Sequence, residues 1–139
     1  MHSLSRHNGN HKCLLNVRDV FSKYVYSSPL RSKTGSAITS AFESILTKNH
    51  HRPIWVCTDK GKEFVNSTFQ NLFKRDGFQF QVCKNPDVKC AVIERLNRTL
   101  KRIMYKYFTC KNTYRYIDVL NKFVRAYNNK IHTTTGMVP

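Results

Sequence analysis

The chain has 139 residues, of which 24 are Lys or Arg and 8 are Asp or Glu, giving a formal net charge of +16. The 40% hydrophobic content, with nine Phe and seven Tyr, is too high for a disordered chain and predicts a single domain over residues 1–139. No apolar run approaches the about 18 residues of a membrane span, and the first residues lack the apolar segment of a secretory signal. We therefore expect an intracellular protein without a membrane partner.

The basic residues are distributed through the chain rather than gathered in one segment. This charge predicts a polyanionic partner, because Lys and Arg gain affinity by releasing the counterions of nucleic acid. DNA or RNA is favoured over a membrane, since no basic amphipathic helix stands apart from the expected fold. A basic protein that is merely very soluble remains the alternative.

The cysteines form an odd set with no Cys-x-x-Cys spacing: Cys13, Cys57, Cys83, Cys90 and Cys110. Three of them lie in apolar runs that are typical of strands or helices. This pattern predicts buried thiols in a reducing compartment rather than zinc ligands or disulfides.

Residues 12–28 predict a hairpin, with a turn at Ser22 and Lys23 and an end at Pro29. Cap residues at 34–36 then precede apolar side chains at three-four spacing up to Leu46, which predicts a helix packed on a sheet. Residues 54–57 are apolar throughout, as in a strand covered on both faces, and this strand ends at Asp59.

Gly61 permits a sharp turn after that strand, and Asn66 is placed to cap a short helix that closes at Gly77. Residues 78–83 alternate as another strand, and 84–89 form a loop. A long helix is expected from residue 90 or 91 to about 109, and a last helix from about 113 to 129. This order predicts an α/β domain with a mixed sheet and flanking helices.

Two carboxylates stand out in so basic a chain. Asp59 follows a buried strand, and Glu94 lies on the polar face of the long helix. Carboxylate oxygens at strand ends of an α/β sheet are typical ligands of Mg²⁺. Either residue alone is more often a turn residue or a solvated helix residue, so the hypothesis of a metal site depends on the pair and its basic surroundings.

The residues around these acids resemble a known family. Asp59–Phe64 (Asp-Lys-Gly-Lys-Glu-Phe) resembles the Asp-x-Gly-x-Glu-Phe signature of retroviral-type integrase catalytic cores, and Glu94–Lys101 resembles the helix with their last catalytic Glu. The 34 residues between the two acids are close to the usual spacing. Asp19–Tyr24 is similar to the second strand of the family, and its C-terminal pattern is matched by Tyr127, Asn128, His132, Gly136 and Pro139. The integrases of transposable elements in animal genomes are the most similar.

This resemblance implies a ribonuclease H-like fold and a DDE-type polynucleotidyl transferase that joins element DNA ends to target DNA with two Mg²⁺ or Mn²⁺ ions. By position, Asp59 would be the second acidic ligand and Glu94 the third. The residues that would face DNA are Lys89, Asn97, Arg98 and Lys101, beside an active-site loop at 85–90. The resemblance also implies a homo-oligomer, and DNA integration implies a nuclear location.

The first acid of the triad is expected on a central strand that would lie before His11, yet residues 1–11 contain no Asp or Glu. Asp19 belongs to the second strand, where the family often has an acid that is not a ligand. We therefore expect a core that is incomplete at its N-terminus and lacks the first strand. Such a chain would be inactive and marginally stable by itself, because two strand edges would lack a partner.

Two other functions remain open. A domesticated or relic protein could keep the fold and the basic face as a non-catalytic nucleic-acid-binding domain. A hydrolytic ribonuclease H-like nuclease is disfavoured, because the motifs at Asp59 and at the C-terminus are integrase-like.

Overall fold

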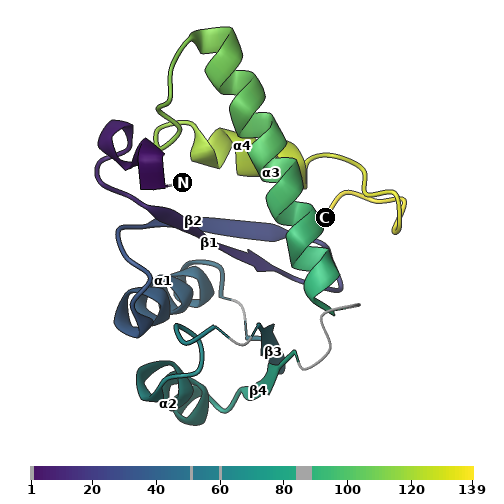
Figure 1. Cartoon of the computed structure of the whole chain (residues 1–139). Helices are drawn as coiled ribbons and strands as arrows, with labels where there is room; N and C mark the ends of the chain where they lie inside the picture. Colours follow the sequence, from purple (N-terminus) through teal and green to yellow (C-terminus); the bar gives the residue numbers. More distant parts are fainter. Residues whose placement is uncertain (1, 51, 60, 84–88) are drawn as a thin grey trace.

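A computed structural model describes residues 2–50, 52–59, 61–83 and 89–139. It confirms an α/β domain with helices around short strands (Figure 1). In chain order the elements are η1 (His2–His7), β1 (Cys13–Arg18), β2 (Val25–Leu30), α1 (Gly35–Lys48), β3 (Trp55–Thr58), α2 (Ser67–Asp76), β4 (Gln79–Val82), α3 (Lys89–Lys111) and α4 (Leu120–Asn128). No helix in the described ranges is both long enough and apolar enough to cross a membrane.

The strands pair in two separate two-stranded sheets. Strands β1 and β2 are antiparallel, as the predicted hairpin requires, whereas β3 and β4 are parallel and joined through α2. Within the described residues no strand pairing connects β1 to β3. Residues 2–7 form the 3₁₀ helix η1, and none of the described residues before His11 adds a strand to either sheet.

The turn of the hairpin is organised by Asp19. Its carboxylate Oδ1 accepts a hydrogen bond from the backbone N–H of Phe21 at 2.8 Å, and its own N–H donates to the carbonyl of Tyr24 at 2.9 Å. Lys23 completes the turn in the left-handed region, with φ of 68°. Asp19 is therefore a turn residue between β1 and β2 in this structure, rather than part of a strand.

The prediction that Pro29 ends the second strand is wrong, because β2 continues to Leu30. Pro29 lies opposite Leu14. Backbone hydrogen bonds to β1 occur at every second residue of β2, and counting from the Asp19–Tyr24 bond the Pro29 nitrogen points away from β1. A proline is tolerated there, since the missing N–H is not needed for the ladder.

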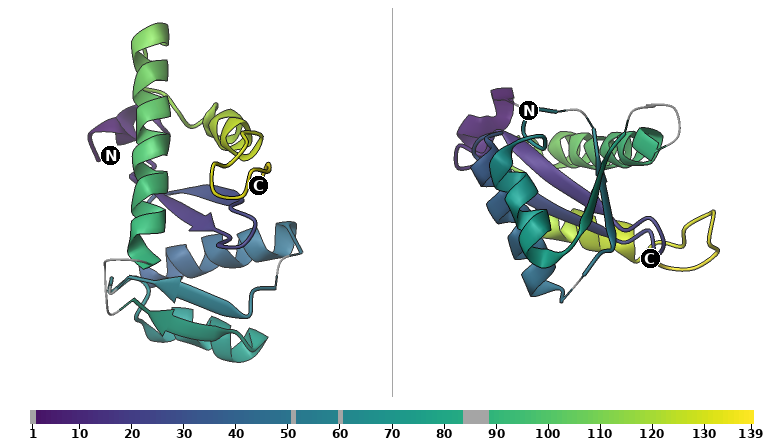
Figure 2. Two further views of the ribbon diagram at one scale, coloured as in Figure 1. Left: turned by 90° about the vertical axis from the view of Figure 1, so that its right-hand side faces the viewer. Right: turned by 90° about the horizontal axis from the view of Figure 1, so that it is seen from below.

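The β1–β2 hairpin lies between helix α1 on one side and helices α3 and α4 on the other (Figure 2). A hydrophobic core fills each side. On one side Cys13 and Leu15 belong to a core shared with helices α1 and α2, whose other buried members are Leu30, Ile38, Phe42, Ile45, Leu46, Phe69, Leu72 and Phe73. Val56 of β3 and Phe80 of β4 pack against this same core. On the other side Leu14 packs against buried residues of α3, α4 and their connection, namely Met104, Phe108, Tyr116, Leu120 and Phe123.

Strand β3 is more exposed than its sequence predicts. Val56 faces the core, but Trp55 retains 61% of its accessible surface and Ile54 retains 74%. We expected a strand covered on both faces; the second face of β3 is uncovered by any described residue. The exposure of Cys57 on this face and of Cys110 on α3 also contradicts the expectation of buried thiols, which Cys13 satisfies.

Helix α4 begins at Leu120 rather than near residue 113 because a distant side chain binds the preceding backbone. Asn8 is fully buried; its Oδ1 accepts hydrogen bonds from the N–H groups of Tyr116 (2.7 Å) and Ile117 (3.0 Å). Its Nδ2 donates to the carbonyls of Leu4 (2.8 Å) and Tyr114 (2.9 Å). The backbone at 114–117 is thereby held in an irregular conformation that no local pattern indicates.

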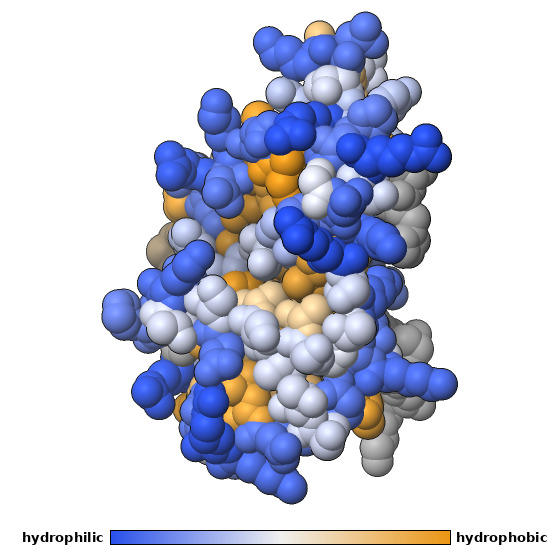
Figure 3. Space-filling model, turned by 90° about the vertical axis from the view of Figure 1, so that its left-hand side faces the viewer, coloured by the Kyte–Doolittle hydropathy of each residue, from blue (hydrophilic) through white to orange (hydrophobic). Residues whose placement is uncertain are grey.

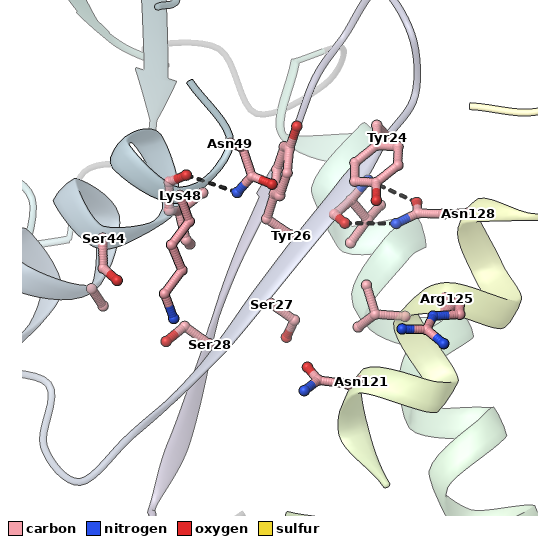
Figure 4. Close-up of a pocket in the computed structure, with 14 residues that line it drawn as sticks. Tyr24, Tyr26, Ser27, Ser28, Ser44, Lys48, Asn49, Asn121, Arg125 and Asn128 are labelled. Carbon is pink, nitrogen blue, oxygen red and sulfur yellow. Dashed lines mark hydrogen bonds between the residues drawn. The ribbon is translucent and has the colours of Figure 1, made fainter. Parts of the chain in front are cut away.

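Asn128 has a similar function at the other end of α4 (Figure 4). Its Oδ1 accepts from the N–H of Val25 at 2.9 Å, and its Nδ2 donates to the carbonyl of the same residue at 2.8 Å. One amide side chain therefore provides both bonds that a neighbouring strand would give to this edge of β2. This pairing fixes α4 on the hairpin.

Replacement of Asn8 by Ala is expected to lower the free energy of unfolding by about 3 kcal/mol, because it leaves buried N–H and C=O groups without partners. Urea denaturation with an unchanged m-value measures this loss. Asn71→Ala, on the exposed surface of α2, is the matched control and should change stability by less than about 0.5 kcal/mol. Equal effects of the two substitutions would contradict the function assigned to Asn8.

Candidate metal and nucleic-acid site

Asp59 lies directly after β3, in the position that its sequence predicts. Its side chain is exposed, and Oδ1 accepts a hydrogen bond from the N–H of Gly61 at 2.9 Å. The Gly61 carbonyl in turn accepts from the N–H groups of Phe64 at 3.0 Å and Val65 at 3.2 Å. The carboxylate is thus oriented by a compact turn and keeps its second oxygen available.

The same turn is anchored by Asn66, the N-cap of α2. Its Oδ1 accepts from the N–H of Phe69 at 2.9 Å, and its Nδ2 donates to the carbonyl of Glu63 at 2.6 Å. Gly35 at the start of α1 lies so close that a Cβ atom there would be 2.5 Å from the Asn66 amide. The close approach of α1 therefore fixes the cap, and through it the segment that follows Asp59.

Glu94 lies on the exposed side of α3, near the start of the helix. The opposite side of the helix is buried through Leu96, Leu100, Met104 and Phe108, so packing fixes which residues face outward. Arg98 and Lys101 are exposed with Glu94, as predicted.

Asn97 has a different environment from these residues. It is half-buried, and its Oδ1 accepts a hydrogen bond from Asn16 Nδ2 on β1 at 2.7 Å. Asn16 Oδ1 also accepts from the Ser27 hydroxyl at 2.6 Å, so the chain of bonds reaches β2. In this structure Asn97 joins α3 to the hairpin.

Two parts of the predicted site lie outside the described structure. Residues 84–88 of the expected active-site loop are not among the described residues, and of Lys89 only the backbone, as the first residue of α3, is described. In the remaining chain no group of three His, Cys, Asp or Glu side chains converges as a metal site.

Sequence reasoning missed Arg18 as a positioning residue for the start of α3. One guanidinium nitrogen donates to the carbonyl of Val92 at 3.4 Å, and the other lies 2.8 Å from Nε2 of His132. Arginine can only donate, so Nε2 must be the acceptor and the imidazole is neutral. The contact connects β1, the helix that carries Glu94 and the C-terminal segment.

The neutral state of His132 agrees with its surroundings. Burial lowers the pKa of the imidazole, and the cations Arg18, Lys23 and Arg95 lower it further. The resemblance at the C-terminus had included His132 in the motif, but a sequence contains no sign that its partner is an arginine on β1.

The surface near α3 is strongly cationic. Residues 89–130 include eleven Lys or Arg and only two acids, Glu94 and Asp118. Asp118 is paired with Arg115, which leaves Glu94 as an isolated acid on a basic helix face. Figure 3 shows how hydrophilic side chains cover most of another face of the molecule, with small apolar areas between them.

The donor set suits a hard divalent cation. Both exposed acids offer carboxylate oxygens, the ligands that Mg²⁺ and Mn²⁺ prefer, and one or two carboxylates with water and phosphate oxygens are a usual Mg²⁺ site. A pair of ions would need a further acid in the same site, and in the described residues no three His, Cys, Asp or Glu side chains converge to hold a metal.

A separate cavity of about 310 Å³ lies along β2, between α1 and α4 (Figure 4). Lys48 and Arg125 line it, together with polar side chains such as Ser27 and Asn121. None of the predicted metal or nucleic-acid residues belongs to this cavity.

Solved structures with the same arrangement are integrase cores. The catalytic core domain of HTLV-2 integrase in complex with magnesium, in its trimeric form, superposes with a TM-score of 0.76 and 22% identity over 91% of this chain and 80% of the other. The dimeric form of that domain gives a TM-score of 0.74 at 22% identity, covering 87% and 78% of the two chains. The chain has the fold of retroviral integrase catalytic cores.

This integrase fold also appears in an assembled complex. An intasome of simian T-cell lymphotropic virus, bound to the PP2A regulatory subunit B56 gamma, contains a chain with a TM-score of 0.81 and 23% identity over 90% of this chain and 45% of the other. An uncharacterized transposon-derived protein of Caenorhabditis elegans is 34% identical over 126 residues, which cover 91% of this chain and 44% of that protein. The chain thus spans less than half the length of this relative. No protein-family model matches the present chain.

Stability of this integrase-fold domain should fall as the pH drops below the ordinary pKa of histidine. His132 has a lowered pKa in the folded state, so the unfolded chain binds the proton more strongly and acid favours unfolding. The contribution of His132 to the free energy of unfolding is complete above about pH 6.5, and it is lost as the pH falls through the folded-state pKa of this residue.

Urea denaturation at pH 7.5 and pH 5.0 measures this dependence. His132→Gln should lose less stability between the two pH values than the wild type. Arg18→Met, which removes the neighbouring cation and donor, should also reduce the difference. Unchanged pH dependence in both variants would show that His132 does not contribute.

Proposed function

We propose that this chain is the core of an integrase- or transposase-type enzyme that joins element DNA ends to target DNA. The observation that carries the proposal is the placement of two exposed acids, Asp59 after β3 and Glu94 on the outer side of α3, within an integrase fold. The transposon-derived relative and the charge of +16 support the same function.

In this function Asp59 and Glu94 would hold Mg²⁺ or Mn²⁺. When bound, two such ions activate an attacking oxygen and stabilise the leaving oxygen in a displacement at phosphorus. Arg98 and Lys101 would bind DNA phosphates beside them, because they are exposed on the same helix as Glu94. Lys89 precedes them at the start of the helix and would add a further cation.

Arg18 would act as a positioning residue in this site. Its bond to the Val92 carbonyl holds the first turns of α3 against β1, and Glu94 follows two residues later. The Asn16–Asn97 bond holds the same helix one turn further along. The direction of Glu94 therefore depends on β1.

We further propose that the first acid of the site belongs to a strand between β1 and β3, and that the 139-residue chain by itself does not join DNA strands. The two sheets share one core but are not paired with each other. In an antiparallel pair the backbone N–H and C=O groups of successive residues point alternately toward the partner strand and away from it. Those of Leu14, Asn16 and Arg18 point away from β2, toward the position of such a strand. Residues 1–11 contain no acid.

A non-catalytic nucleic-acid-binding domain is the second candidate function. It is favoured by one observation: no three His, Cys, Asp or Glu side chains converge as a metal site in the described residues. The basic face of α3 would serve this function equally well. The dependence of DNA affinity on Mg²⁺ distinguishes the two candidates.

Self-association and a nuclear location are part of the proposal. The solved HTLV-2 cores occur in dimeric and trimeric forms, which supports an oligomer here. A function on genomic DNA requires entry into the nucleus. Sedimentation and the location of a tagged chain in cells test these two points.

DNA binding should depend steeply on salt through the cations of α3. The double substitution Arg98→Met and Lys101→Met is expected to reduce the slope of log K against log salt by about 2, because each lost phosphate contact removes about 0.9. Lys33→Met with Lys74→Met removes the same charge from exposed positions away from α3 and should change the slope much less. Equal changes would contradict a DNA-binding surface on α3.

Mg²⁺ should raise the DNA affinity of the wild type about tenfold at constant ionic strength, equivalent to about 1.4 kcal/mol. Asp59→Asn and Glu94→Gln should lose this increase, because each removes a proposed metal ligand. Their affinity without Mg²⁺ should equal or exceed that of the wild type, since an acid near the phosphates has been neutralised. A wild type that is indifferent to Mg²⁺ would favour the non-catalytic function.

A further inference from the structure

Two cysteines meet at the end of the β3–β4 sheet. The Sγ atoms of Cys57 and Cys83 are 2.6 Å apart. Cys57 lies in β3 opposite Gln81, and Cys83 follows the last residue of β4. The N–H of Cys83 donates to the carbonyl of Thr58 at 2.8 Å, which continues the parallel pairing to this point and fixes the two residues relative to each other.

The pair lies on the open face of this sheet. Val56 of β3 and Phe80 of β4 point into the core beneath α1 and α2, so the alternating residues point to the other side. Cys57 is exposed and Cys83 is half-buried. A small oxidant in solution can therefore reach the Cys57 sulfur.

We infer that Cys57 and Cys83 form a reversible redox pair that closes to a disulfide. A peroxide oxidises the Cys57 thiol to a sulfenic acid, and the peroxide O–O bond breaks with release of water. The Cys83 sulfur then attacks the Cys57 sulfur, the S–O bond breaks, and a second water leaves. The two thiols have together lost two protons and two electrons, and hydrogen peroxide has gained them to give two water molecules.

The separation of the sulfurs favours this chemistry over metal binding. Two thiolates on one tetrahedral zinc, each at about 2.3 Å from the metal, lie about 3.8 Å apart. The observed 2.6 Å is far shorter and requires a shift of only about 0.5 Å to reach the S–S bond length of about 2.05 Å. In the described residues no third His, Cys, Asp or Glu completes a metal site with the pair.

The cross-link would connect two segments that lead to the candidate site. Asp59 follows Cys57 by two residues, and Cys83 precedes residues 84–88, which lead to α3 and Glu94. The disulfide would close a loop over residues 58–82, including the turn at Gly61 and helix α2. It would thereby restrain the end of β3 on β4. This inference stands apart from the proposed DNA chemistry and holds for a non-catalytic domain as well.

Peptide mapping of the whole chain after treatment with hydrogen peroxide tests the inference. Remaining thiols are alkylated, and the digest is analysed by mass spectrometry without reduction. A peptide pair that joins Cys57 to Cys83, lighter by two hydrogens and separated by dithiothreitol, is expected. The oxidised protein should also unfold at a higher temperature than the reduced protein, because the loop is closed.

Single substitutions identify the partners. Cys57→Ser and Cys83→Ser should each abolish the cross-link and the thermal shift, whereas Cys110→Ser, at an exposed cysteine on α3, should retain both. Cys57 and Cys83 that remain fully alkylated, or that pair with other cysteines or between chains, would overturn the inference. The mapping of the wild type decides the question even if a variant fails to fold.

Discussion

The structure depends on a hairpin that is apolar on both faces. Cys13 and Leu15 of β1 alternate with Leu14, so a helical layer must cover each side to remove these side chains from water. Helix α1 covers one face, with α2 packed against α1, and α3 and α4 cover the other. Among the described residues β3 and β4 pack against the first layer and no element covers their opposite face, and this asymmetry determines where the chain can present reactive groups.

Helices α3 and α4 are held on this hairpin by amide side chains that replace backbone partners. Asn128 supplies both hydrogen bonds to the edge of β2, Asn8 supplies those of the α3–α4 connection, and the Asn16–Asn97 pair joins strand to helix. Such bonds have fixed directions, whereas apolar contacts alone allow a helix to slide or rotate. The orientation of Glu94 therefore depends on hydrogen bonds between polar side chains. The hydrogen bond from the charged Arg18 side chain to the Val92 carbonyl adds to them at the start of α3.

Local patterns predicted much of this fold. The helix periodicities, the cap at Asn66, the turn after Asp59 and the hairpin at Asp19 all depend on residues close together in sequence. The start of α4 could not be predicted, because Asn8 acts across more than a hundred residues. The exposure of Trp55 and Cys57 was missed because an apolar run does not reveal whether a neighbour covers it. The hydrogen bond of Asn97 could not be predicted either, because its partner Asn16 on β1 is distant in sequence.

The exposure of Trp55, Cys57 and Asp59 has one physical cause. They alternate with Val56 and Thr58 along the same segment, and nothing in the described structure covers their face. A carboxylate that is to bind a hydrated cation must stay exposed, and so must a thiol that is to meet an oxidant. Trp55 is a large apolar side chain on the same face, and 61% of its accessible surface is exposed. A strand or helix that covers Trp55 would border both Asp59 and the cysteine pair, so coverage of this face would control access to both.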